Sequence, residues 1–162
     1  MRKRAGWMAL ALLLLASGCG APADSGGAET AEVSLTALYA GMAESCGWGE
    51  DYMTEIEGEL LEEYYPGLGE IPARQLIAKV PAMSSDVNEI VLLQCETAED
   101  AEAAAAILQA RIDSQVEGGA LYPETMEAWK SAKVLRQGTC AALIASGEFQ
   151  ESLEEQFNRQ FS

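Results

Sequence analysis

The sequence has no histidine and few basic residues, and these two deficits exclude several classes of function. Without imidazole there is no Ser-His-Asp or Cys-His catalytic unit and no histidine ligand for zinc. The chain carries 10 Lys and Arg residues against 26 Asp and Glu residues, which gives a formal net charge of −16 at pH 7. A field of this sign repels phosphates, so we expect no nucleic acid partner.

The common catalytic motifs are also missing. The sequence contains no C-x-x-C, no G-x-S-x-G and no phosphate-binding glycine loop. A pair of carboxylates for glycoside hydrolysis could be drawn from the 26 acidic residues, but that abundance makes any chosen pair uninformative. The sequence therefore predicts no catalytic residue, no cofactor and no metal ligand.

No apolar run reaches the roughly 20 residues that span a bilayer. The run from Trp7 to Ala16 is short, follows the cationic start Met1-Arg2-Lys3-Arg4 and precedes the small residues Ala16-Ser17-Gly18-Cys19, an arrangement typical of a signal peptide. It resembles the signal of bacterial lipoproteins, whose cysteine becomes the first mature residue and carries the lipid. The resemblance implies a signal peptide over residues 1–18 and lipidation at Cys19, and the alternative is an ordinary cleaved signal.

Residues 19–30 are small, polar and rich in glycine, so we predict a flexible tether. The eleven residues 20–30 would have a root-mean-square span of roughly 18 Å, which would hold a folded domain close to the membrane. Loss of residues 1–18 removes three basic residues and no acidic one, which leaves 144 residues with a formal charge of −19. We predict one domain over residues 31–162, on the outer side of the cell membrane and anchored through lipid on Cys19.

The first half of this domain shows two helical patterns. Apolar residues recur every three or four positions from Ala31 to Cys46, which predicts a helix that starts at Thr30 and ends at Gly47. The acidic segment 50–65 predicts a second, short amphipathic helix, interrupted or weakened at Gly58. A calcium site in this segment is the alternative, although the order of residues in a calcium-binding loop is absent.

Hairpins and helices alternate in the rest of the chain. Segments 75–83 and 89–95 predict one β-hairpin, and segments 133–137 and 140–145 predict another. A capping box at Thr97 and Asp100 opens a helix over residues 98–117, and Pro123 opens a short one. Apolar residues at every fourth position from Phe149 to Phe161 predict a closing helix.

The predicted fold class is α+β, in the order helix, hairpin, helix, hairpin, helix. Two hairpins would build one antiparallel sheet with the helices packed on it in a two-layer arrangement. The basic residues Lys130, Lys133 and Arg136 gather in one stretch, and salt bridges to the acidic helices are the commoner outcome for such a group.

Several short motifs together carry a resemblance. They are the lipoprotein signal, Pro81-Ala82-Met83, Asn88-Glu89-Ile90, the alanine-rich helix, Tyr122-Pro123-Glu124 and the hairpin at Gly138. They resemble the bacterial lipoprotein family called domain of unknown function 4358, over about Val33 to Phe161. That family has no established activity, so the resemblance implies an extracytoplasmic lipoprotein and supplies no catalytic residues.

Two classes of function agree with these patterns. The first is a membrane-tethered binding or protein-interaction module, which contacts another envelope protein or a small ligand. The alternative is a carboxylate-based envelope hydrolase, which requires two carboxylates within about 10 Å of each other in a concave cleft.

The three cysteines downstream of Cys19 lie in apolar contexts. Cysteine in such positions behaves as a small hydrophobe, so we expect Cys46, Cys95 and Cys140 to be reduced. A bridge between Cys95 and Cys140 is the alternative, because both lie on predicted strands and an exported location permits disulfides.

Overall fold

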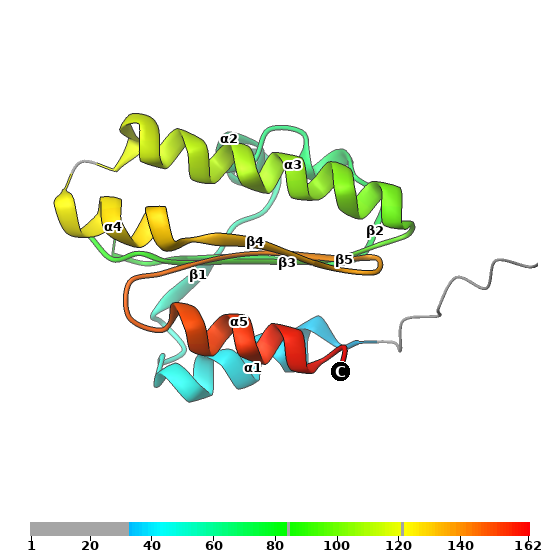
Figure 1. Ribbon diagram of the computed structural model, residues 1–162, viewed down its shortest axis with the longest axis horizontal. Helices are drawn as coiled ribbons and strands as arrows, with labels where there is room; N and C mark the ends of the chain where they lie inside the picture. Colours follow the sequence, from blue (N-terminus) through cyan, green and yellow to red (C-terminus); the bar gives the residue numbers. More distant parts are fainter. Residues whose placement is uncertain (1–32, 84, 121) are drawn as a thin grey trace, which may run out of the picture.

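The computed structural model describes residues 33–83, 85–120 and 122–162 (Figure 1). The predicted signal peptide, the predicted tether and Cys19 lie outside the described residues. The described part is a mixed α+β structure in which helices surround one antiparallel sheet.

The sheet has five strands in the spatial order β1-β2-β3-β5-β4. The strands are β1 (Met53–Glu55), β2 (Ala73–Pro81), β3 (Asn88–Cys95), β4 (Lys133–Gln137) and β5 (Cys140–Ser146). The hairpins β2–β3 and β4–β5 are confirmed, and β3 pairs with β5 to join them. Strand β1 was not predicted, and it adds an antiparallel edge to β2.

Five α-helices and two short irregular turns connect these strands. The helices are α1 (Leu35–Cys46), α2 (Gly58–Tyr64), α3 (Ala98–Ser114), α4 (Pro123–Ser131) and α5 (Gln150–Arg159). A 3₁₀ turn spans Leu68–Glu70, and a wide turn over Gln115–Gly119 continues α3. The capping box is confirmed, since the Asp100 N–H donates to Thr97 Oγ1 and the Thr97 N–H donates to Asp100 Oδ2, both at 3.1 Å.

The N-terminal part of the domain differs from the predictions. Helix α1 begins at Leu35 with Ser34 as its N-cap, later than predicted from Thr30. Segment 50–65 is not one helix, because β1 occupies its first half and α2 starts only at Gly58. Gly58 has a φ of +55°, a backbone conformation that breaks a right-handed helix at the point where the strand turns into α2.

Helices cover both faces of the sheet, so the prediction of two layers is wrong. Helices α2, α3 and α4 lie on one face, and α1 and α5 lie on the other (Figure 1). Along β3, Val91, Leu93 and Cys95 enter the core under α3, whereas Ile90 and Leu92 enter the core over α1 and α5. Strands β3 and β5 are buried along their whole length, which explains their uninterrupted apolar runs.

Candidate functional site

A polar cleft lies on the α3 face of the sheet and has a volume of about 540 Å³. We call it the α3–α4 cleft, and it is lined by Tyr64, Val80, Pro81, Ala82, Asp86, Val87, Glu89, Arg111, Gln115, Gly119, Ala120, Tyr122, Thr125 and Trp129. These residues come from the end of β2, the loop between β2 and β3, the start of β3, the facing parts of α2, α3 and α4, and the segment between α3 and α4. A volume of this size falls within the range of about 300–1,000 Å³ typical of ligand sites.

Glu89 is the unusual residue of this cleft, because it is a carboxylate at a position of β3 where the alternation of the strand predicts an apolar side chain. It has the same parity along β3 as Val91 and Leu93, so it points into the α3 core. Its side chain is only 5% exposed. A carboxylate this deeply buried needs a partner, because burial of an unpaired charge is very costly.

Arg111 of α3 is that partner. Its Nε donates to Glu89 Oε1 at 2.9 Å and its Nη2 donates to Glu89 Oε2 at 3.0 Å, which is the two-pronged geometry that favours Arg–carboxylate pairs. Burial lowers the pKa of Arg111, but the hydrogen bonds and the charge of Glu89 outweigh burial and raise it overall. The pair joins strand β3 to helix α3 across 22 residues of sequence.

Tyr65 completes the buried network from the end of α2. Its hydroxyl donates to Glu89 Oε1, and the residue is fully buried. Burial, followed by the neighbouring Glu89 carboxylate, raises the pKa of Tyr65 well above its ordinary value of 10.0. The hydroxyl therefore stays protonated and acts as a donor to Glu89.

Aromatic rings surround the Arg111 guanidinium. Its Cζ lies 4.6 Å from the ring centroid of Tyr64, 5.3 Å from that of Trp129 and 5.9 Å from that of Tyr65. Such contacts attract a cation to the ring faces and keep the guanidinium plane in place. The side chain of Arg111 remains 16% exposed and reaches the cleft.

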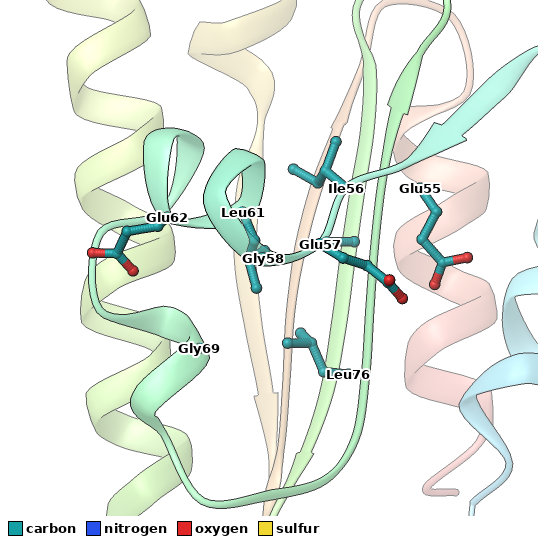
Figure 2. A pocket seen from close by; sticks show the side chains of 9 residues that line it. Glu55, Ile56, Glu57, Gly58, Leu61, Glu62, Gly69 and Leu76 are labelled. Atoms are coloured by element: carbon teal, nitrogen blue, oxygen red, sulfur yellow. The ribbon is translucent and has the colours of Figure 1, made fainter.

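A second hollow of about 430 Å³ lies beside α2 and is lined by three carboxylates (Figure 2). Figure 2 shows Glu62 pointing away from Glu55 and Glu57. Glu55 pairs with Lys79 Nζ at 2.8 Å, and Glu62 accepts the backbone N–H of Gly67 at 3.0 Å. Glu62 therefore does not converge with the other two carboxylates, and Glu55 is held by a salt bridge.

The acidic residues of the α3–α4 cleft are also engaged. Both oxygens of Glu89 accept from Arg111, and Asp86 accepts from the Tyr52 hydroxyl at 3.2 Å. Within residues 33–83, 85–120 and 122–162, no group of three or more Cys, Asp or Glu side chains could hold a metal ion. The same ranges contain no helix long and apolar enough to span a membrane.

The three described cysteines are free thiols. Cys95 points into the core under α3 and Cys140 into the core over α1 and α5, although β3 and β5 are neighbours. Side chains on opposite faces of a sheet cannot form a disulfide without a change of register, which explains why the Cys95–Cys140 alternative fails.

The basic cluster forms salt bridges within the chain, as expected. Lys130 pairs with Glu127 at 2.7 Å, Lys133 with Glu154 at 3.3 Å and Arg136 with Glu102 at 3.2 Å; all three cations are exposed. Because nearby carboxylates already neutralise these residues, they do not form a basic patch.

The first described residues are held at the end of the sheet opposite the α3–α4 cleft. Gln75 Nε2 donates to Val33 O at 2.8 Å and to Gln94 Oε1 at 2.7 Å, and the Leu35 N–H donates to Gln75 Oε1 at 3.0 Å. Gln94 is five residues from Glu89 on the same strand, a separation of about 17 Å. Figure 1 accordingly places the start of α1 and helix α4 toward opposite ends of the molecule.

Sequence reasoning missed the Glu89–Arg111–Tyr65 network. The available signal was a single acidic residue at the start of an apolar strand, followed by an arginine three positions after Leu108 on the buried face of a helix. The one site residue that the sequence predicts, Cys19, lies outside the described residues.

The network and the cleft characterise a mixed α+β protein with a polar site between its sheet and its helices. Residues 48–146 match the family described as "Domain of unknown function (DUF4358)". The match covers more than half of the chain, so this protein belongs to that family. No curated protein and no solved structure matches the chain.

Proposed function

We propose that this protein is a lipid-anchored, extracytoplasmic binding module whose ligand occupies the α3–α4 cleft. The lipid would be attached at Cys19 after removal of residues 1–18, and residues 19–30 would serve as the tether. The cleft carries this proposal, because it combines a concave shape with a small number of convergent polar groups and aromatic side chains.

The position of the cleft supports the proposal. Val33 is bound near Gln94, whereas the cleft begins at Glu89, at the other end of β3. A tether that reaches the folded domain at Val33 would therefore leave the mouth of the cleft on the side away from the membrane. A ligand from the surroundings could enter without passing between the protein and the lipid surface.

The engagement of the carboxylates favours binding over hydrolysis. A hydrolase of the carboxylate type needs one acid and one base that face the same bond. Here Arg111 takes both oxygens of Glu89, and in the α2 hollow Glu62 points away from the other two carboxylates (Figure 2) while Glu55 is paired with Lys79. The site is therefore better suited to holding a ligand than to cleaving one.

Mass spectrometry of the mature N-terminus tests the anchor. We expect an N-terminal Cys19 that carries a lipid, and we expect Cys19→Ala to leave an unprocessed precursor. An unmodified N-terminus at any other residue would overturn the lipoprotein part of the proposal.

Photocrosslinking in cells tests the binding part. Tyr122 lies at the cleft and is 63% exposed, whereas Leu60 is an exposed apolar residue of α2 that does not line the cleft. With p-benzoylphenylalanine at position 122, we expect an adduct on the peptide that contains this position. The same substitution at position 60 is the matched control, and equal labelling or no labelling at the two positions would contradict the proposal.

A further inference from the structure

The charge balance of the α3–α4 cleft bears on which ligands it can take. Its one cation, Arg111, is neutralised by Glu89, and Asp86 is the remaining charged residue of the lining. An anionic ligand would have to compete with Glu89 for the guanidinium while facing Asp86 and a chain of net charge −16. The cleft therefore disfavours anions.

A cationic ligand would meet a different obstacle. The ring faces of Tyr64 and Trp129, which could form a cage for a cation, already hold the Arg111 guanidinium at 4.6 and 5.3 Å. A second cation at these rings would be repelled by Arg111. A neutral ligand avoids both obstacles.

Both hydrogen-bond donors and hydrogen-bond acceptors remain available in the cleft. Arg111 uses Nε and Nη2 for Glu89 and also hydrogen-bonds to Tyr65, so its donors serve the buried network. The side chains of Gln115 and Trp129, which also line the cleft, make no hydrogen bond to another described residue. Donors thus lie in one cavity with the acceptor oxygens of Gln115 and Asp86, and a hydroxyl group, which both donates and accepts, matches such a mixture.

The mouth of the cleft adds an exposed aromatic surface. Tyr122 is 63% exposed, and Thr125 Oγ1 accepts from its backbone N–H at 3.4 Å and donates to its carbonyl oxygen at 2.9 Å. An exposed ring next to hydrogen-bonding groups suits a ligand with an apolar C–H face and polar edges, which is the chemistry of a pyranose ring.

We propose that the α3–α4 cleft binds a neutral oligosaccharide. This inference rests on the proposed binding function and adds the class of ligand to it. The sugar hydroxyls would bond to the Gln115 amide and the Trp129 indole N–H. One sugar ring would stack on Tyr122.

The inference can be tested by calorimetric titration of the full chain in a detergent without a sugar headgroup. The neutral probes are tri-N-acetylchitotriose, cellotriose and maltotriose, and the charged probes are trilysine and citrate. We expect at least one neutral trisaccharide to bind and neither charged probe to bind. Failure of all three trisaccharides would overturn the inference.

Three variants locate the binding. We expect Tyr122→Ala and Gln115→Ala each to weaken trisaccharide binding by about tenfold, which is about 1.4 kcal/mol, and Leu60→Ala to leave it unchanged. Gly119→Ala is a fourth, subtler variant, because a Cβ there would lie 2.5 Å from Gln115 Nε2 and would displace the amide. Trisaccharide binding that survives both Tyr122→Ala and Gln115→Ala would place the sugar elsewhere and overturn the inference.

The charged probes separate this inference from the proposed function. Binding of trilysine or citrate that is lost in Tyr122→Ala would show that the cleft is a binding site for another class of ligand. That result would overturn the saccharide assignment and leave the binding module standing. The absence of binding by every probe, together with no crosslink at position 122, would overturn both.

Discussion

The two faces of the sheet are built from the same strands but are stabilised in different ways. Over α1 and α5 the buried layer is mainly apolar, with Leu92, Leu153 and Phe157 among its fully buried side chains, and its buried polar residues Asn88, Gln94 and Ser146 are uncharged. Under α3 the apolar layer is interrupted by Glu89 and Arg111. One strand, β3, supplies residues to both layers, so the difference arises from alternate positions of a single segment.

This contrast indicates that the polar network serves something other than stability. Replacement of a buried ion pair by apolar residues of similar size is often neutral or stabilising, so such a pair is weak evidence of a stability role. The α1/α5 face shows that this chain can cover the sheet without a buried ion pair, since the buried polar residues there, Asn88, Gln94 and Ser146, carry no charge. The network lies where the cleft opens, which is consistent with a role in shaping and presenting the cleft.

The largest expected effect comes from removal of one partner of the buried pair. Glu89→Gln leaves Arg111 without its counter-charge, and we expect a loss of about 3–5 kcal/mol in the free energy of unfolding. The double variant Glu89→Gln with Arg111→Met removes both charges and should recover more than half of this loss. Urea unfolding of the two single variants and the double variant measures the coupling.

The opposite face supplies the control for this cycle. Leu92→Ala, on the other side of the same strand, should cost about 2–5 kcal/mol through the loss of apolar contacts. It should show no coupling to Arg111→Met. If Leu92→Ala were coupled to Arg111→Met as strongly as Glu89→Gln is, the ion pair would not be confined to the α3 face in its energetic effect.

A smaller effect is expected from the Tyr65 hydroxyl. Tyr65→Phe removes a hydrogen bond to a charged group and should cost about 1.5–3 kcal/mol near neutral pH. Because folding raises the pKa of Tyr65, its contribution is fully present below about pH 10 and is lost as pH rises further. The free energy of unfolding of the wild type should therefore fall more steeply above about pH 10 than that of Tyr65→Phe. Urea unfolding at a series of pH values measures this, and an equal pH dependence of the two proteins would contradict it.

Local sequence signals predicted much of the fold because they act over a few residues. The capping box at Thr97 and Asp100, the two hairpins and the C-terminal helix all follow from spacing, and the structure contains each of them. Strand β1 was missed because Met53–Glu55 is only three residues long and owes its form to pairing with β2. No local pattern encodes that pairing.

The layers and the site depend on information that spacing does not carry. The two-layer prediction overlooked that uninterrupted apolar strands, such as Cys140–Ser146, are buried on both sides. The contact between Glu89 and Arg111 requires the register of β3 and the rotation of α3, which are set by tertiary packing. Sequence could mark Glu89 as an exception in its strand, but it could not name the partner.

The buried residues Cys95 and Cys140 lie on opposite faces of the sheet, so the pKa of a thiol can be compared between the two faces. Burial raises the pKa of Cys95, under α3, from 9.0 to about 11, and burial also raises the pKa of Cys140, over α1 and α5. The neutral thiol of Cys95 therefore contributes stability below pH 9 that is lost as pH rises toward about 11. Cys95→Ala should lower the free energy of unfolding by about 1 kcal/mol at neutral pH. It should also reduce the loss of stability between pH 9 and about pH 11.

A thiol count provides the control for these variants. Because Cys46, Cys95 and Cys140 are free, titration of the denatured domain over residues 31–162 without reductant should give three thiols. A count of one would indicate a disulfide, and the alkaline behaviour of Cys95→Ala would then have another origin.

The smallest expected effects come from the exposed ion pairs, which have the same chemistry as Glu89–Arg111 without its burial. Lys130→Ala removes a pair in which both side chains are well exposed, so we expect a change within about 0.5 kcal/mol. Lys133→Ala should cost slightly more, up to about 1 kcal/mol, because Glu154 is only 16% exposed and is also held by Gln150 Nε2 at 2.8 Å. Both effects should shrink further in high salt, since the two lysines are open to solvent. Urea unfolding at low and high salt measures this, and a loss of about 3 kcal/mol from either lysine would mean that burial is not what separates the Glu89–Arg111 pair from the surface pairs.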